Sequence, residues 1–264
     1  MSQYSKLQTA LLNTNKDIYE VFMNDNTTLQ SGAFELHIER NKVPGVTAVN
    51  IQGFNDAHPS TWRTPWELSN TQAWMYPTSN TDLTFSSTST ETITVLVTGL
   101  DDTYAIKTAT VTFASSTTGT ITSGTNGFFR INRMQITKGT SVGNISATNN
   151  GNTYSYISAG SGISQSATFS VPLGYTFYLN RANAYTTNNG AQYCSYRIYT
   201  QRYVDGILTP QIVLTAPFTQ FYSTMRVVPR AYTEKTDIQW QLNQSNPAPG
   251  SIQLEGILVS NSIV

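Results

Sequence analysis

Residues 81–114 limit the possible folds of this chain more than any other stretch. Apolar residues occupy every second position in each of two runs, and threonines fill most of the positions between them: Ile93, Val95 and Val97 in the first run, Ala109, Val111 and Phe113 in the second. A period of two residues is typical of a β-strand that buries one face. The turn-forming residues 99–102 separate the runs, so the segment predicts a β-hairpin.

Further alternating runs follow, and turn-forming residues separate most of them. Residues 145–157 predict a second hairpin around Asn149–Asn152, and residues 172–174, Pro-Leu-Gly, predict a tight turn between two strands. Residues 115–127 are small and rich in turn formers, which favours a loop with a short central strand. Because almost no helical period is present, the sequence predicts an all-β fold.

The predicted organisation is two antiparallel β-sandwich or jelly-roll units preceded by an irregular N-terminal arm. Residues 1–80 are assigned to the arm and a partly irregular connector, residues 81–160 to a first β-sandwich, and residues 161–264 to a second β-sandwich or jelly roll. A loose apolar stripe from Leu7 to Phe22 is interrupted by poor helix formers, so a short helix and an extended arm are both compatible with the start of the chain.

The charge balance argues against whole classes of partner. Charged residues make up 11% of the chain, with 15 basic and 15 acidic side chains, so bulk attraction to nucleic acid or to an anionic membrane is not expected. No apolar run is long enough to span a membrane, and the first residues lack the features of a signal peptide, which predicts synthesis in a cytoplasm. The single cysteine, Cys194, is predicted to be a small buried strand residue.

A catalytic constellation is missing from the sequence. The two histidines, His37 and His58, lie far apart, and Cys194 carries no sign of an activated thiol. Asp101 and Asp102 are adjacent on a predicted turn, which indicates turn hydrogen bonding rather than a positioned acid and base. We therefore expect a protein that is not an enzyme and that has no catalytic, metal-binding or cofactor-binding residues.

Aromatic residues are the candidates for contact with a partner. A proline-rich connector contains three tryptophans, Trp62, Trp66 and Trp74. A later run contains three tyrosines, Tyr193, Tyr196 and Tyr199. One interpretation is that these rings stack on sugars or form a partner-binding patch. The other is that the tryptophans close the end of a sandwich and hold the connector against it.

The order of the motifs between about residues 80 and 180 resembles a β-rich module of tailed-bacteriophage virion structural proteins, of the decoration, head-fibre or tail-associated type. The motifs are the hairpin, followed by RINRM at residues 130–134, VGNIS at 142–146, YISAG at 156–160 and ATFSVPLGYTFYL at 167–179. The resemblance implies a non-enzymatic virion component, synthesised in the host cytoplasm, that contacts other virion proteins.

The composition predicts self-assembly as well. Uncharged, threonine-rich strand faces suit persistent contacts between subunits, and symmetric assembly protects sheet edges, so we expect a homo-oligomer, most simply a trimer. Two other functions stay open. The chain could be a host-surface glycan-binding or receptor-recognition module that uses the aromatic residues, or a polysaccharide hydrolase on a β scaffold whose acids converge in space.

Overall fold

The described residues form thirteen β-strands and one short 3-10 helix. The computed structural model describes residues 46–58, 79–164, 166–186, 194–204, 207–244 and 248–263. The elements are β1 (Val46–His58), β2 (Thr84–Leu100), β3 (Ile106–Gly124), β4 (Arg130–Lys138), β5 (Ile145–Asn149), β6 (Asn152–Ile157), β7 (Thr168–Ser170), β8 (Tyr175–Thr186), β9 (Cys194–Val204), β10 (Ile207–Phe218), β11 (Phe221–Thr233), β12 (Thr236–Gln244), β13 (Ala248–Ser260) and the 3-10 helix η1 (Asn261–Ile263). The all-β prediction is confirmed.

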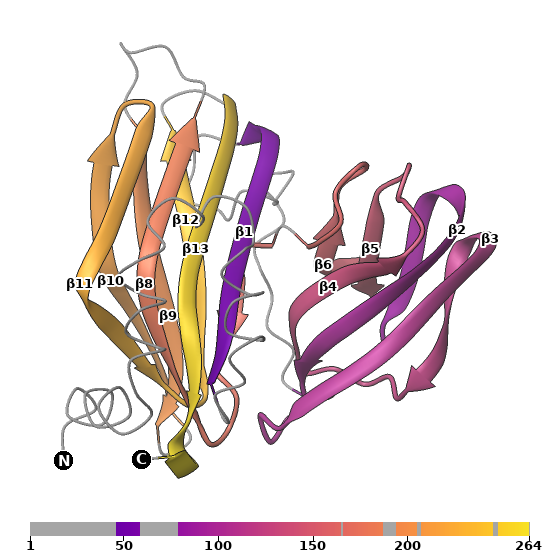
Figure 1. The fold of residues 1–264 in the computed structure, drawn as a ribbon, viewed down its shortest axis with the longest axis horizontal. Helices are drawn as coiled ribbons and strands as arrows, with labels where there is room; N and C mark the ends of the chain where they lie inside the picture. Colours follow the sequence, from indigo (N-terminus) through magenta and orange to yellow (C-terminus); the bar gives the residue numbers. More distant parts are fainter. Residues whose placement is uncertain are drawn as a thin grey trace.

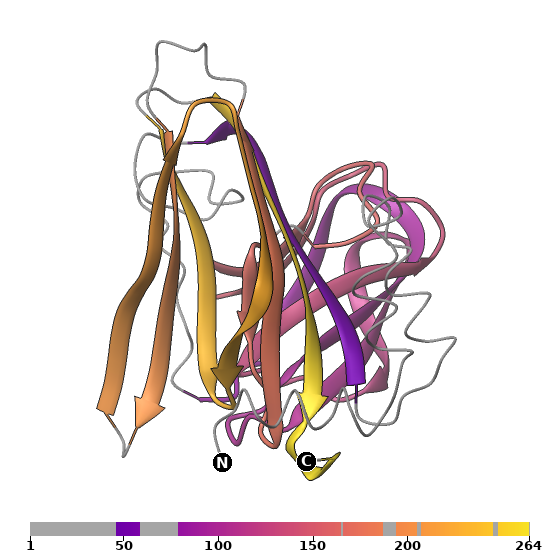
Figure 2. The same cartoon turned by 60° about the vertical axis from the view of Figure 1, so that its left-hand side comes forward.

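Eight of these strands form a jelly roll. One four-stranded sheet has the order β1-β13-β8-β11 and the other has the order β10-β9-β12-β7. Each successive strand of the eight lies in the opposite sheet from the one before it, except that β9 and β10 are neighbours in one sheet. This alternation between two antiparallel sheets is the topology of an eight-stranded jelly roll. Figure 1 shows its strands running side by side, and Figure 2 shows the two sheets from another side.

The jelly-roll core lies between the two sheets because each strand turns alternate residues inward. On β8, Ala182 and Ala184 are buried while Asn183 and Tyr185 face outward. The opposite sheet contributes Tyr196, Ile198, Ile238, Trp240 and Leu242, all at most 1% exposed. Small residues on β8 leave room for the large rings of the facing sheet.

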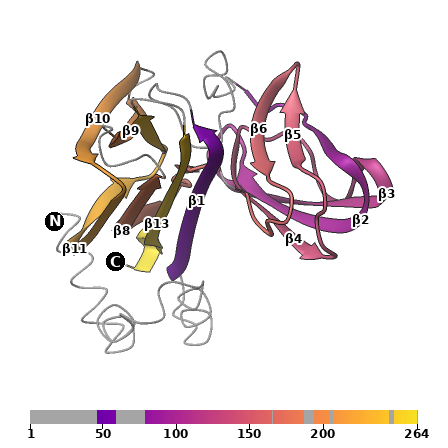
Figure 3. The same cartoon turned by 90° about the horizontal axis from the view of Figure 1, so that it is seen from above.

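The strand β1 joins the jelly roll from the beginning of the described chain. It pairs with β13 from Val46, opposite Val259, to His58, opposite Ala248. The remaining unit, residues 79–164, is therefore inserted between the first and second strands of the jelly roll. The sequence boundaries grouped β1 with the N-terminal connector, because a partner strand at the far end of the chain leaves no trace in a local pattern. Figure 3 shows β1 at the side of the jelly roll that faces the inserted unit.

The inserted unit is built on the predicted hairpin, which folds over itself. Its sheet has the order β3-β2-β5-β6, and β4 also pairs with β2. The β2–β3 register shifts between Ser86 and Glu91. The end of β3 lies against its own beginning, because a Cβ on Gly124 would meet the backbone of Thr108 and Ala109. There the hydroxyls of Thr112 and Thr122 lie 3.1 Å apart. The fold encloses a second core that includes Val97, Val111 and Phe113, each fully buried.

The prediction of a loop with a short central strand at residues 115–127 is wrong for most of that range, because β3 continues without a break to Gly124. Close packing explains the glycine of this segment, because a Cβ on Gly119 would lie 2.6 Å from a Val111 methyl group and 2.8 Å from the Phe113 ring. Most of the other residues are at least partly exposed serines and threonines, so the segment lacks the row of large residues by which strands are recognised.

Turns join the strands as predicted, although the first begins at Asp101 because Gly99 and Leu100 belong to β2. Between β2 and β3, Asp101 Oδ1 accepts hydrogen bonds from the backbone N–H groups of Thr103 (2.9 Å) and Ala105 (3.0 Å), which is the expected turn chemistry. Between β5 and β6, Asn150 and Gly151 both have positive φ, as a two-residue hairpin turn requires. Cys194 is buried on a strand, as predicted.

Glu91 fastens a loop to the bend of the long hairpin. This side chain is 4% exposed, and its Oε1 accepts hydrogen bonds from the backbone N–H groups of Val142 (2.9 Å) and Gly143 (2.5 Å) and from the Ser89 hydroxyl (3.0 Å). Burial alone would raise the pKa of Glu91, but these hydrogen bonds outweigh it and hold the pKa below its ordinary value.

We expect Glu91→Gln to destabilise the protein at neutral pH and to weaken its acid sensitivity. A carboxyl whose pKa is lowered by folding adds stability above its ordinary pKa of 4.5, and that stability is lost as the pH falls. Loss of the charged acceptor should cost about 1–3 kcal/mol at pH 7. Urea unfolding between pH 3 and pH 7 measures both effects. Asp102→Asn, at an exposed carboxylate, is the matched control; superimposable pH profiles for the Glu91→Gln variant and the parent would contradict the prediction.

Candidate functional site

The aromatic residues named from the sequence do not form one site in the described structure. Trp62, Trp66, Trp74 and Tyr193 lie outside the described residues. Tyr196 is 1% exposed, and its ring centre lies 4.8 Å from that of Tyr222, so it is a core residue. Tyr199 is half-buried on the other face of β9, where its hydroxyl accepts a hydrogen bond from Gln201 (2.9 Å). Tyr196 and Tyr199 therefore do not share a surface.

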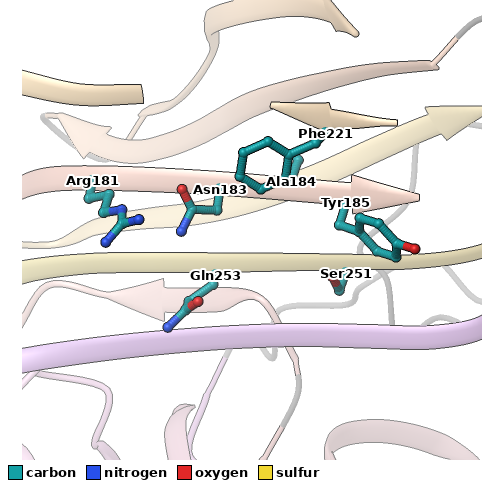
Figure 4. Close-up of a pocket in the computed structure, with 7 residues that line it drawn as sticks. All are labelled: Arg181, Asn183, Ala184, Tyr185, Phe221, Ser251 and Gln253. Atoms are coloured by element: carbon teal, nitrogen blue, oxygen red, sulfur yellow. The ribbon is translucent and has the colours of Figure 1, made fainter. Parts of the chain in front are cut away.

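A different aromatic pair lies on the outer face of the sheet β1-β13-β8-β11. Tyr185 of β8 and Phe221 of β11 are directly opposite each other in the strand register. Tyr185 is 48% exposed and Phe221 is 60% exposed, which makes them two of the most exposed large hydrophobic side chains described. They line an open groove of about 280 Å³ together with Arg181, Asn183, Ala184, Ser251 and Gln253, and Figure 4 shows these side chains.

The polar side of the groove comes from the same strand alternation. Asn183 faces outward two residues before Tyr185, and Gln253 is its register partner on β13. The Ser223 hydroxyl donates a hydrogen bond to Asn183 Oδ1 (2.7 Å), which fixes the orientation of that amide. Gln253 Nε2 donates weakly to Glu255 Oε1, at 3.3 Å. Two planar amides thus lie beside two exposed rings.

The charges at one end of the groove balance each other. Arg181 Nη1 lies 4.0 Å from Glu255 Oε2, and the two residues are register partners on β8 and β13. Burial raises the pKa of Glu255, and the neighbouring Arg181 partly offsets this. Among the residues that line the groove, Arg181 is the charged one. Its pairing with Glu255 leaves the groove without a strong net field.

Sequence reasoning missed this groove, although one signal was available. In residues 181–185 a polar or aromatic residue alternates with alanine, so the large side chains point away from the core. The pairing of Tyr185 with Phe221 and of Asn183 with Gln253 depends on which strands become neighbours. That information is in the jelly-roll topology rather than in any local pattern.

A buried ion pair joins the inserted unit to the jelly roll. Arg130 of β4 and Asp237 of β12 have side chains that are 2% and 1% exposed. Arg130 donates to both carboxylate oxygens, from Nε to Oδ1 (3.0 Å) and from Nη2 to Oδ2 (2.9 Å). Ser170 Oγ (2.5 Å) and the Tyr104 hydroxyl (3.3 Å) also donate to Asp237. This bidentate geometry with extra donors is the kind that offsets the cost of burying two charges.

Aromatic rings and a second polar contact complete this junction. The Arg130 guanidinium lies 3.8 Å from the centre of the Phe129 ring, and the Tyr104 ring meets Phe129 edge to face. Burial, and next the Asp237 carboxylate, raise the pKa of Tyr104, so its hydroxyl remains a donor at neutral pH. Asn132 and Ser170 exchange two hydrogen bonds of 2.8 Å each. The two units are therefore held as one body.

No group of three or more His, Cys, Asp or Glu side chains that could hold a metal ion occurs among the described residues. Within the same part of the chain, no helix is long and apolar enough to cross a membrane.

Comparison with known protein families, with curated proteins and with solved structures finds no match for this chain.

Proposed function

We propose that this protein is a non-enzymatic structural component of a tailed-phage virion, a capsid decoration, head-fibre or tail component that assembles with itself and with other virion proteins. The observation that carries the proposal is the jelly roll, whose two sheets have the orders β1-β13-β8-β11 and β10-β9-β12-β7. Jelly rolls of eight strands are the architecture of many viral capsid domains. A fold alone does not define a function, so the proposal also needs the motif series.

The motif series that resembles phage virion proteins runs along consecutive strands. Its first motif lies on β2 and β3, and its last lies on β7 and β8. The series thus covers the inserted unit and the first two jelly-roll strands that follow it in the sequence. The buried ion pair of Arg130 with Asp237 joins these two units. A rigid connection between two β units is suited to a protein that bears load in a particle.

The edges of the sheets supply surfaces for assembly. In the jelly roll, β1, β11, β10 and β7 stand at the ends of the two strand orders, and the backbone of β7 is already hydrogen bonded to Asn132 of the inserted unit. Edge strands present unpaired backbone groups, which proteins cover, charge or pair with another chain. Within β10, residues 214–218 carry no charged side chain that would block such pairing, although Pro217 removes one backbone donor from this strand. Association with further copies or with another virion protein is a direct way to protect these edges.

The proposal predicts that the protein is found in purified phage particles and self-associates in solution. Peptide mass spectrometry of particles from cells infected by the phage that encodes the chain should detect it in a fixed ratio to the major capsid protein. Light scattering of the isolated protein should give a multiple of 29.1 kDa, most simply three chains. Electron cryomicroscopy of the particle would then give its position. A stable monomer at high concentration, together with its absence from particles, would overturn the proposal.

A further inference from the structure

The outer face of the sheet β1-β13-β8-β11 combines features that do not serve the core. Tyr185 is 48% exposed and Phe221 is 60% exposed, so neither ring contributes to the fold the full stabilisation that burial of apolar surface provides. They are neighbours across two strands rather than scattered rings. Contiguous exposed apolar residues are a feature of binding surfaces, whereas single scattered ones are normal on any surface.

The groups beside the rings limit the chemistry of the ligand. In Figure 4, Asn183 and Gln253 lie along the strands next to the aromatic pair, and Ser251 lies below Tyr185. Asn183 uses Oδ1 to accept from Ser223, and no described residue accepts a hydrogen bond from its Nδ2. The groove thus offers amide and hydroxyl groups next to flat apolar faces. A sugar ring has the complementary pattern, with an apolar face of C–H groups and hydroxyls around its edge.

Charge and size narrow the ligand further. Arg181 is paired with Glu255, so the groove has no uncompensated cation to attract an acidic sugar. Its volume of about 280 Å³ is just below the usual range for ligand sites, roughly 300–1,000 Å³. The groove is open rather than enclosed, because Tyr185 and Phe221 are both about half or more exposed, and this allows a longer chain to continue beyond it. These properties fit a short stretch of a neutral polysaccharide.

We propose that this groove, centred on Tyr185 and Phe221, binds neutral hexose glycans by stacking sugar rings on the aromatic pair and hydrogen bonding their hydroxyls to Asn183 and Gln253. The inference does not depend on the proposed virion role, because it uses only the geometry of this sheet face.

The test is a titration of the full chain with cello-, manno- and galacto-oligosaccharides, with uronic-acid oligosaccharides as the acidic comparison. At least one neutral series should bind. Tyr185→Ala or Phe221→Ala should weaken binding about 2- to 12-fold each, the range expected for loss of one stacking ring. Tyr185→Phe should retain most of the affinity because it keeps the ring. Leu173→Ala, at an exposed apolar residue outside this groove, is the matched control and should bind as the parent does.

Other results would overturn the proposal. They are binding to none of the neutral series, binding only to the acidic oligosaccharides, or binding that both alanine variants leave unchanged. Hydroxyl-radical footprinting gives a second measurement. In the parent without glycan, Tyr185 and Phe221 should be labelled, and neutral oligosaccharide should protect them. Protection before any glycan is added would mean that another copy or another part of the chain covers the groove, which would also overturn the proposal. Circular dichroism checks that each variant is folded.

Discussion

Asp237→Ala should lower the free energy of unfolding by about 3–5 kcal/mol, among the largest effects expected from a single substitution in this protein. The change would leave the Arg130 guanidinium buried without its carboxylate, and it would remove the acceptor for the Ser170 and Tyr104 hydroxyls. The cost arises from the unpaired groups that remain rather than from the attraction that is lost. Urea unfolding at pH 7 measures it directly.

A double variant separates the cost of the unpaired groups from the loss of the ion-pair attraction. Arg130→Met with Asp237→Leu removes both charges and fills a similar volume with apolar groups, and buried ion pairs can often be replaced in this way at little cost. We therefore expect the double variant to be more stable than Asp237→Ala alone. If the double variant were as unstable as the single one, the ion pair itself would be the source of stability. A loss of less than about 1 kcal/mol in Asp237→Ala would show that water reaches the junction.

This junction marks the limit of what the sequence could predict. In the sequence, residues 128–136 alternate without a clean apolar face, and the pairing of this segment with β2 is irregular. The alternation could not reveal why a charged residue lies there. Arg130 can be buried, at 3% exposed, because the fold places the carboxylate of Asp237, far along the chain, within ion-pair distance of it. Buried charge pairs of this kind depend on the tertiary fold and have no local period.

The same limit applies to the candidate site. Hairpins and turns were predictable because their signals are local: Asn150 and Gly151 carry the positive φ angles that the turn residues imply. The groove required the neighbours of β8 to be known, and those are strands from distant parts of the sequence. The aromatic residues that cluster along the sequence include Tyr196, which is predicted to contact a partner but is buried in the core. Alternation places a residue on a face, but it does not say whether that face is the core.

Trp240→Ala is the second substitution with a large expected effect. Trp240 is fully buried at the centre of the jelly roll, and truncating a buried tryptophan typically costs about 3–5 kcal/mol through lost contacts and an unfilled cavity. Trp240→Phe is the matched control. It keeps an aromatic ring and removes an indole N–H that has no hydrogen-bond partner in the described structure, so part of its cavity cost is offset. We expect the phenylalanine variant to lie between the alanine variant and the parent.

The location of this loss tests whether the two units unfold together. If the junction couples them, Trp240→Ala should reduce hydrogen-exchange protection in the inserted unit, at Val95 and Val111, by the same free energy as in the jelly roll. Combining Trp240→Ala with Asp237→Ala should break that equality, because the buried contact that joins the units is then lost. Full protection of Val95 and Val111 in Trp240→Ala alone would contradict the coupling. In that case the inserted unit would be an independently stable domain, and the rigidity inferred for the junction would not extend to its unfolding.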